Sequence, residues 1–177
     1  MKSSFYLKKN PYPFFAAWLF AALLFMAPAG LLAQKWVAHS GKGAPAGALN
    51  IQTNHLQYVA RIPLPNGDFA VGKRKGNGSN AFYVADGAMA QAEDYDILVA
   101  TPSEVLWEKV TNGAIPRNAL VAGRRDGNRV YPCICINPNN KREMVGETKQ
   151  GLGYCESFGQ GTGWLGVVHQ ITTYKVA

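Results

Sequence analysis

The stretch WEKVTNGAIPRNALVAGRRDGNRVY, residues 107–131, contains a lone tryptophan, a Gly-Ala-Ile-Pro turn, a short apolar run and an Asp-Gly turn that leads into a strand. A stretch of this kind that occurs once can be any loop, whereas one that occurs twice indicates a repeated architecture. A similar order of residues begins at residue 36, in WVAHSGKGAPAGALNIQTNHLQY. The two stretches therefore predict two related units in one chain.

The match between the two units continues beyond the quoted stretches. The aligned pairs are Trp36 with Trp107, Tyr58 with Tyr131, Gly72 with Gly146, Phe82 near Tyr154, and Tyr95 with Tyr174. The sequence distance between partners grows along the chain, so we expect the second unit to carry small insertions in its loops. We predict tandem units at residues 34–106 and 107–177.

The first 33 residues have the layout of a secretory signal peptide. Lys2, Lys8 and Lys9 precede an uncharged run over residues 13–33 that ends in small residues. We expect this leader to be removed, and the protein to be secreted or to lie in the periplasm or cell envelope. An uncleaved membrane anchor is the alternative, because about 20 apolar residues are long enough to cross a bilayer.

The charge of the chain does not indicate a nucleic-acid-binding protein. The formal net charge is +7, but three of the 18 Lys and Arg residues lie in the leader, which leaves a mild excess over the 11 acidic residues. The basic clusters, Lys73-Arg74-Lys75 and Arg124-Arg125, lie in Gly-rich segments without interleaved aromatic residues. We expect both clusters to be solvated loops and predict no nucleic-acid partner.

The three cysteines, Cys133, Cys135 and Cys155, predict one disulfide and one spare thiol in an exported protein. Cys133 and Cys135 lie on the same face of a predicted strand, so either one could meet Cys155 on a neighbouring strand. We take Cys133 with Cys155 as the working pair. A zinc site formed with His169 has weak support, because a single Cys-x-Cys lacks a second paired ligand motif, and we predict neither a metal nor a cofactor.

The pattern of residues after the leader predicts an all-β fold. Short runs rich in β-branched and aromatic residues are separated by Asn-Gly, Asp-Gly and Pro-Asn turns. The predicted strands are residues 56–62, 81–85, 95–100, 118–122, 129–136 and 166–176. Residues 86–93 are the one candidate for a helical turn. We expect a β-sandwich or a barrel-like sandwich.

Both units resemble the DM9 repeat family, whose pattern looks like a Trp, then Gly-x-(Val/Ile)-Pro-x-x-Ala-(Val/Leu), an Asp-Gly turn, a Tyr-Val strand, a Gly-Lys turn and a closing Tyr-x-(Val/Ile)-Leu. The second unit supplies Trp107, Gly113, Ile115-Pro116, Ala119-Leu120, Asp126-Gly127, Tyr131 and Gly146. The first supplies Trp36, Pro45, Ala48-Leu49, Tyr58-Val59, Gly72-Lys73 and Tyr95-Asp96-Ile97-Leu98. The resemblance implies an all-β tandem repeat that binds mannose-type glycans without catalysis and can form a homodimer.

The resemblance also implies a sugar site made by the Asp of the Asp-Gly turn and the Lys of the Gly-Lys turn. Here the pair is divided between the units. The second unit has Asp126 but Glu147 in place of the lysine, and the first has Lys73 but Thr53-Asn54 in place of the aspartate. The site can therefore be a weakened one around Lys73 and Asn54, a composite one from Asp126 and Lys73, or absent. The candidate sugar contacts are Asn54, Lys73, Asp126, Glu147 and Trp164. Asp-Gly is also the usual pair of a hairpin turn.

The remaining aromatic and polar residues do not indicate an enzyme. Trp36 and Trp107 suit packing in the core or between the units. Trp164, in the Gly-rich GQGTGWLG, suits sugar stacking, membrane contact or folding back onto the sheet. A nucleophile elbow is absent and the histidines are isolated. The sequence predicts a secreted, non-catalytic carbohydrate-binding protein, and the alternative is a structural or protein-interaction module of the cell envelope that has lost sugar binding.

Overall fold

The computed structural model describes residues 35–51, 56–101, 104–111, 114–136, 140–159 and 162–174, with side chains as far as Ser157. All of these belong to the unit Gln34–Ala177, which begins where the chain divides after Ala33. The predicted leader, residues 1–33, lies outside the described residues. In the described part, no helix is long and apolar enough to span a membrane.

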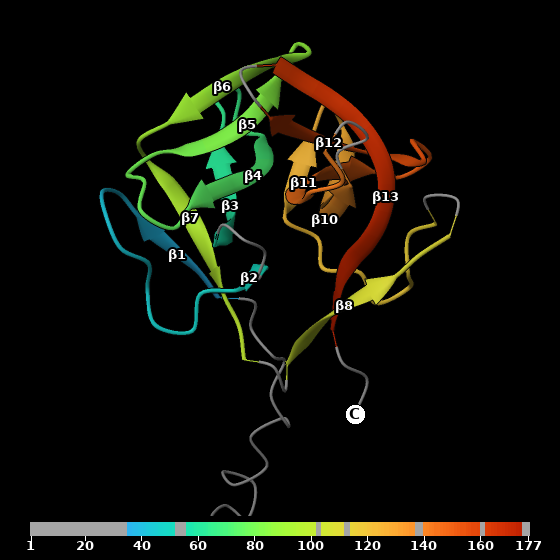
Figure 1. Ribbon diagram of the computed structural model, residues 1–177, viewed down its shortest axis with the longest axis horizontal. Helices are drawn as coiled ribbons and strands as arrows, with labels where there is room; N and C mark the ends of the chain where they lie inside the picture. Colours follow the sequence, from blue (N-terminus) through green and yellow to red (C-terminus); the bar gives the residue numbers. More distant parts are fainter. Residues whose placement is uncertain are drawn as a thin grey trace, which may run out of the picture. The chain divides into compact units, whose positions relative to one another are not determined.

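The regular structure of the described residues consists of β-strands (Figure 1), which confirms the all-β prediction. The strands are β1 Lys35–His39, β2 Asn50–Ile51, β3 Gln57–Pro63, β4 Phe69–Lys75, β5 Ala81–Ala85, β6 Ala88–Ala92, β7 Tyr95–Val99, β8 Val105–Lys109, β9 Gly123–Arg125, β10 Asn128–Ile136, β11 Glu143–Lys149, β12 Tyr154–Gly159 and β13 Thr162–Tyr174. Each of the pairings described between them is antiparallel.

The strands form one hydrogen-bonded order, β1-β7-β3-β4-β5-β6-β13-β12-β11-β10-β9, with β2 paired to β3 and β8 paired to β13. Strand β10 pairs with both β11 and β13, so β10, β11, β12 and β13 close a four-stranded ring. Strand β4 contacts β9, β10 and β11. The strands before β8 and those after it therefore pack against each other through β4.

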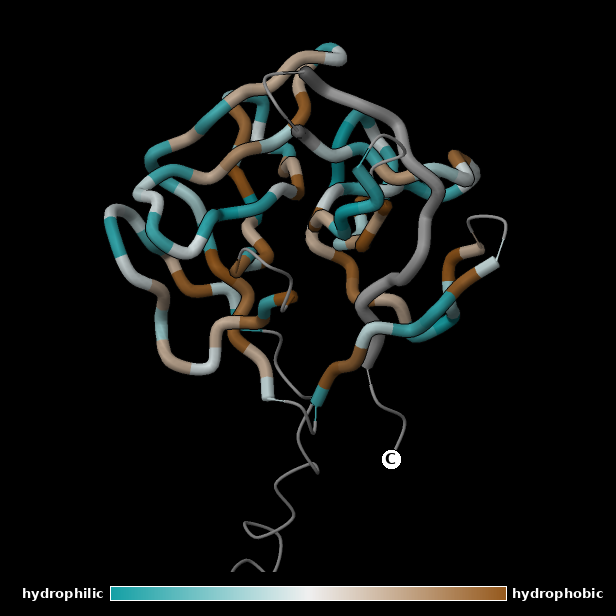
Figure 2. Tube along the Cα trace, in the orientation of Figure 1, coloured by the Kyte–Doolittle hydropathy of each residue, from teal (hydrophilic) through white to brown (hydrophobic). Residues whose placement is uncertain are grey.

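An apolar core joins these two groups of strands. Its buried members include Val59, Val71 and Leu98 from the first group and Val130 and Val145 from the second. The two tryptophans, Trp36 and Trp107, are partly buried and pack against this cluster, which is the packing role predicted for them. In Figure 2, hydrophobic residues are interspersed with hydrophilic ones along the strands, as expected when each strand presents one face to a core.

Two glycines occupy matching places in the two groups. A Cβ added at Gly72 would lie 2.1 Å from the carbonyl oxygen of Phe82, and one at Gly146 would lie 2.1 Å from that of Glu156. Only glycine allows the strands to approach so closely. Phe82 and Glu156 thus hold comparable positions beside their glycines, two residues from the Tyr154 that the sequence placed near Phe82.

The pairing register also bears on the end of the alignment. The equivalent register pairs are Ala60 with Ile97 and Cys133 with Ile171. Ile97 beside β3 and Ile171 beside β10 thus hold comparable register positions. This differs from the predicted alignment of Tyr95 with Tyr174, because a register is decided by the strand that each residue pairs with.

Two predicted elements differ from the structure. The helical turn predicted for residues 86–93 is wrong, because Asp86 and Gly87 both have positive φ, at 49° and 73°, and form the turn between β5 and β6. This geometry suits a two-residue hairpin turn. The strand predicted for residues 118–122 is also wrong, because a turn in which the Ala119 N–H donates to the Pro116 carbonyl, at 3.0 Å, occupies its start.

Candidate functional site

The candidate site surrounds the hairpin formed by β9 and β10. Its turn residues, Asp126 and Gly127, both adopt positive φ, at 51° and 78°, which Asp-Gly accommodates in a type I′ turn. The Asp126 carboxylate projects from the tip of the hairpin and is 70% exposed. Its Oδ2 lies 3.2 Å from Nζ of Lys149, which comes from the end of β11.

The Asp126–Lys149 pair contributes little to folding, since ion pairs at this exposure are worth about 0–1 kcal/mol. It does, however, place a carboxylate acceptor on the turn beside an ammonium donor from β11. A polar ligand can therefore replace the ion-pair contact at low cost. The pair is the nearest equivalent of the Asp and Lys that the resemblance implies.

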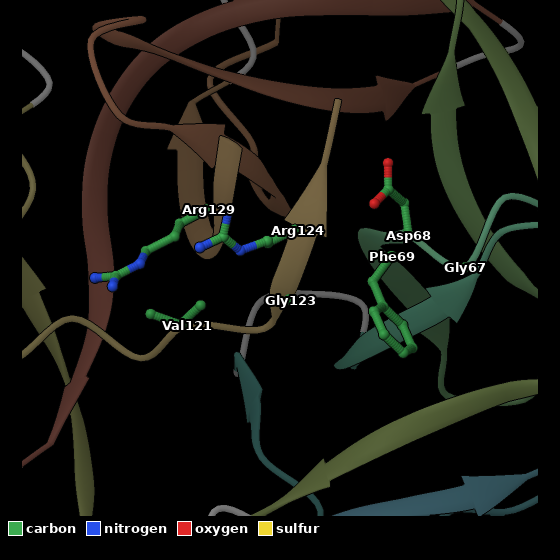
Figure 3. Close-up of a pocket in the computed structure, with 7 residues that line it drawn as sticks. All are labelled: Gly67, Asp68, Phe69, Val121, Gly123, Arg124 and Arg129. Carbon is green, nitrogen blue, oxygen red and sulfur yellow. The ribbon is translucent and has the colours of Figure 1, made fainter. Parts of the chain in front are cut away.

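An open groove of about 650 Å³ adjoins the same hairpin. Its lining includes Asp68, Phe69, Val121, Gly123, Arg124 and Arg129. Figure 3 shows Asp68 and Phe69 on one side of the groove and Val121, Arg124 and Arg129 on the other, with Gly123 between them. The lining thus combines one carboxylate, two guanidinium groups and an aromatic ring.

Hydrogen bonds and close packing hold the two sides of this groove together. The Asp68 carboxylate accepts from the backbone N–H of Asp126, at 2.9 Å, and from Nδ2 of Asn66, at 3.1 Å. A Cβ at Gly123 would lie 2.8 Å from the Phe69 side chain, so glycine is what allows β9 to rest on that ring. The groove is therefore formed before any ligand binds.

The partly buried Arg61 side chain lies against the Phe69 ring. The guanidinium carbon of Arg61 lies 4.4 Å from the centre of the Phe69 ring and 4.7 Å from that of Trp36. Arg61 also donates to the Asp96 carboxylate, at 2.9 and 2.5 Å, and to the Ala122 carbonyl, at 3.3 Å. These contacts fix the ring and the segment that leads into β9.

Glu147, which we predicted as a sugar contact, lies in the interior at 2% exposure. Its carboxylate accepts from the Val71 N–H at 2.7 Å and from Arg125 Nη1 at 3.2 Å, and Arg125 Nη1 also donates to the Val84 carbonyl at 3.0 Å. Burial raises the pKa of Glu147, and the Val71 N–H and the charge of Arg125 oppose that rise. Glu147 therefore joins β4 to β11.

Lys73 is also buried, at 4% exposure, within β4. Its Nζ lies 3.1 Å from Sδ of Met144, and burial lowers the pKa of Lys73 from 10.5 to about 8. A sugar has no access to this ammonium, so the structure offers Lys149 instead of Lys73 as the cation beside Asp126.

The basic cluster around Lys73 is not the solvated loop that we predicted. Arg74 is fully buried, donates to the Gly78 carbonyl at 2.7 Å and lies over the Tyr58 ring at 5.5 Å. The strand continues through Gly72 because a missing Cβ lets the β5 backbone approach. Glycine here marks close strand packing and not a turn.

Two further predicted sugar contacts cannot be placed in the site. Asn54 lies outside the described residues. Trp164 lies in β13 opposite Ser157, and its side chain lies outside the described part of the structure.

The cysteines form the working pair, with a disulfide between Cys133 and Cys155 whose Cα atoms are 6.4 Å apart. Cys135 is a free, buried thiol that donates to the Met144 carbonyl at 3.5 Å, and burial raises its pKa to about 12. Among the described residues, no group of three or more His, Cys, Asp or Glu side chains could hold a metal ion.

Sequence reasoning missed the partners of Asp126. Lys149 lies two residues after Glu147, so strand alternation places both side chains on one face of β11, but only the pairing of β10 with β11 brings Lys149 to Asp126. Asp68 is 58 residues from Asp126, and nothing local in the sequence connects them. The sequence predicted Arg129 to lie in a strand but did not identify Arg124 as the residue opposite it across the hairpin.

Comparisons with known proteins define the family. No match was found among curated proteins. The fold is similar to the crystal structure of the nematode sperm cell motility protein MFP2B, with a TM-score of 0.63 and 13% sequence identity, over 81% of this chain and 45% of that one. The chain thus spans less than half the length of that protein, and the likeness concerns the fold alone. The DM9 repeat model matches residues 52–158, more than half of the 177 residues, and the chain belongs to the DM9 repeat family.

Proposed function

We propose that this chain is a secreted, non-catalytic carbohydrate-binding protein that holds a mannose-type glycan at the β9–β10 hairpin. The observation that carries the proposal is the contact between the exposed Asp126 carboxylate and the partly buried Lys149, with 3.2 Å between Oδ2 and Nζ. Vicinal hydroxyls each donate and accept a hydrogen bond, so a site that binds them needs an acceptor beside a donor. Membership of the DM9 repeat family supports the same reading.

The proposal includes two tandem repeats that meet at β4 and β11. The matching glycines, Gly72 and Gly146, and the matching registers of Ile97 and Ile171 support this organisation. Each repeat also binds the backbone of the other. Glu147 accepts the Val71 N–H, and Gln57 accepts the Val145 N–H at 3.3 Å.

A glycan array probed with the purified protein tests sugar binding. Asp126→Asn removes the charge but suits the same turn, because asparagine tolerates positive φ. Asp86→Asn is its matched control, since Asp86 is an exposed Asp-Gly turn residue with φ of 49°. We expect Asp126→Asn to lose mannose-type glycans and Asp86→Asn to keep them.

The lysine is tested in the same way. Lys149→Gln is expected to weaken the same array signals, whereas Lys109→Gln, at the exposed end of β8, is expected to leave them unchanged. If both aspartate variants and both lysine variants bind as the wild type does, the hairpin is not the sugar site. If the folded wild type binds no glycan, the lectin assignment is wrong.

The burial of Lys73 and Glu147 favours a second candidate function, a structural or protein-interaction module of the cell envelope. These residues stand where the family pattern has its lysine, and both lie in the interior. If the second candidate function is right, the protein is well folded and binds no glycan of any class on the array. Circular dichroism of the protein used on the array separates it from a lectin that failed to fold.

A further inference from the structure

Two arginines of the groove stand directly opposite each other. Arg124 of β9 pairs with Arg129 of β10, both side chains are exposed, and both line the groove. Like charges directly opposite on antiparallel strands destabilise the pairing. The hairpin therefore carries a repulsion that a bound negative charge would offset.

Neither arginine takes part in an ion pair within the described residues. The ion pairs found there join Arg61 to Asp96, Arg125 to Glu147, and Lys149 to Asp126. Arg124 makes one long hydrogen bond from Nη1 to the Gly127 carbonyl, at 3.4 Å. A guanidinium has five N–H donors in a planar fork that matches a carboxylate or sulfate. Most of the N–H donors of Arg124 and Arg129 can therefore bind solvent or a ligand in the groove.

The opposite wall indicates what else the ligand carries. Asp68 accepts two hydrogen bonds in the structure, and a carboxylate has about four lone-pair sites, so it can still accept a hydroxyl. Phe69 and Val121 add apolar surface, which suits the C–H face of a sugar ring. With two positive charges against one negative, the groove suits a ligand with one anionic group and several hydroxyls.

We propose that this groove binds an acidic saccharide, with the carboxylate or sulfate held by Arg124 and Arg129 and a ring hydroxyl held by Asp68. The inference rests on the proposed function in one respect, since it extends sugar binding from the tip of the hairpin to its side. The acidic unit lies in the groove, and the neutral sugar lies at Asp126.

The experiment measures binding of three polymers to the purified protein by calorimetry: polygalacturonate, which carries carboxylates, dextran sulfate, which carries sulfates, and neutral mannan. The test variant is Arg124→Gln with Arg129→Gln. The charge-matched control is Arg117→Gln with Arg142→Gln, which removes two exposed arginines outside the groove.

We expect the test variant to bind at least one acidic polymer more weakly by about tenfold or more, because it loses the charge-assisted hydrogen bonds of both guanidinium groups. Mannan binding and the control variant should match the wild type. The polymer that responds identifies carboxylate or sulfate as the anionic group. If the control weakens acidic polymers as much as the test variant does, or neither changes, the groove is not an acidic-sugar site.

This design separates the two proposals. If the test variant loses binding to the acidic polymers and the wild type does not bind mannan, the result supports the groove proposal and refutes the mannose site. If mannan binding depends on Asp126 and replacement of both arginines does not change the binding of acidic polymers, the result supports the mannose site and refutes the groove proposal.

The melting temperature tests the cross-strand repulsion without a ligand, because Arg129→Gln should raise it relative to Arg142→Gln. A lower value would contradict the cross-strand repulsion.

Discussion

Replacement of Lys73 by methionine should stabilise the protein, although it removes a residue at a position that the family resemblance marks for sugar binding. Lys73 lies at 4% exposure beside Met144, and a methionine has a similar length without a charge. The charged ammonium is penalised there, since burial lowers its pKa to about 8. Lys73→Met removes that penalty.

The magnitude follows from the pKa values. A folded pKa of about 8 against a reference value of 10.5 corresponds to roughly 3 kcal/mol at 1.36 kcal/mol per unit, an order-of-magnitude figure. Because the folded pKa is lowered, the folded state binds fewer protons than the unfolded state between about pH 8 and 10.5. The wild type therefore gains stability as the pH rises through that window.

Urea unfolding at pH 7 and pH 9.5, on wild type and Lys73→Met, measures the effect. The advantage of the variant should approach 3 kcal/mol at pH 7 and shrink by about 2 kcal/mol at pH 9.5. Groups other than Lys73 titrate in both proteins and cancel in the difference. Lys109→Met, at the exposed end of β8, serves as the control and should change stability by less than about 0.5 kcal/mol.

Two results would refute the reasoning. A Lys73→Met protein that is less stable than the wild type at pH 7 would show that the ammonium contributes to folding. If the stability difference between the two proteins does not change with pH, burial does not lower the pKa of Lys73.

Three other substitutions test how the two groups of strands are held. Glu147→Leu leaves the Val71 N–H and Arg125 without their buried acceptor and should cost about 3–5 kcal/mol in urea unfolding; a loss below about 1 kcal/mol would contradict the assigned role. Gly146→Ala forces a Cβ to within 2.1 Å of a backbone carbonyl and should cost at least about 1–3 kcal/mol, so an unchanged melting temperature would be inconsistent with this packing. Replacement of both Cys133 and Cys155 by serine opens a link of sequence separation 22 and should cost about 2–4 kcal/mol, and equal stability under reducing and oxidising conditions would argue against the disulfide.

The features that the sequence predicted correctly are local ones. The Asp126-Gly127 turn follows from the preference of Asp-Gly for positive φ, and the strand that follows it was predicted within one residue. Trp36 and Trp107 were predicted to pack, and both lie partly buried against the apolar core. The all-β class followed from turn residues at short spacing.

The features that it missed depend on tertiary packing. Lys73 was predicted to be exposed because it is charged and follows a glycine, but that glycine permits close strand pairing and the lysine points into the interior. Glu147 likewise follows a glycine that permits close strand pairing, and it is buried with Arg125 as its partner. The partner of Asp126 could not be identified without the register that places β11 beside β10.

The measurement that tests the central claim most directly is an NMR titration of the isotopically labelled protein with a mannose oligosaccharide. We expect the amide signals of Asp126 and Gly127 and the side-chain signal of Lys149 to shift together and saturate, while those of Lys73 and Asp86 stay in place. Shifts centred on Lys73, or on the β5–β6 turn at Asp86, would contradict the assignment of sugar binding to the β9–β10 hairpin.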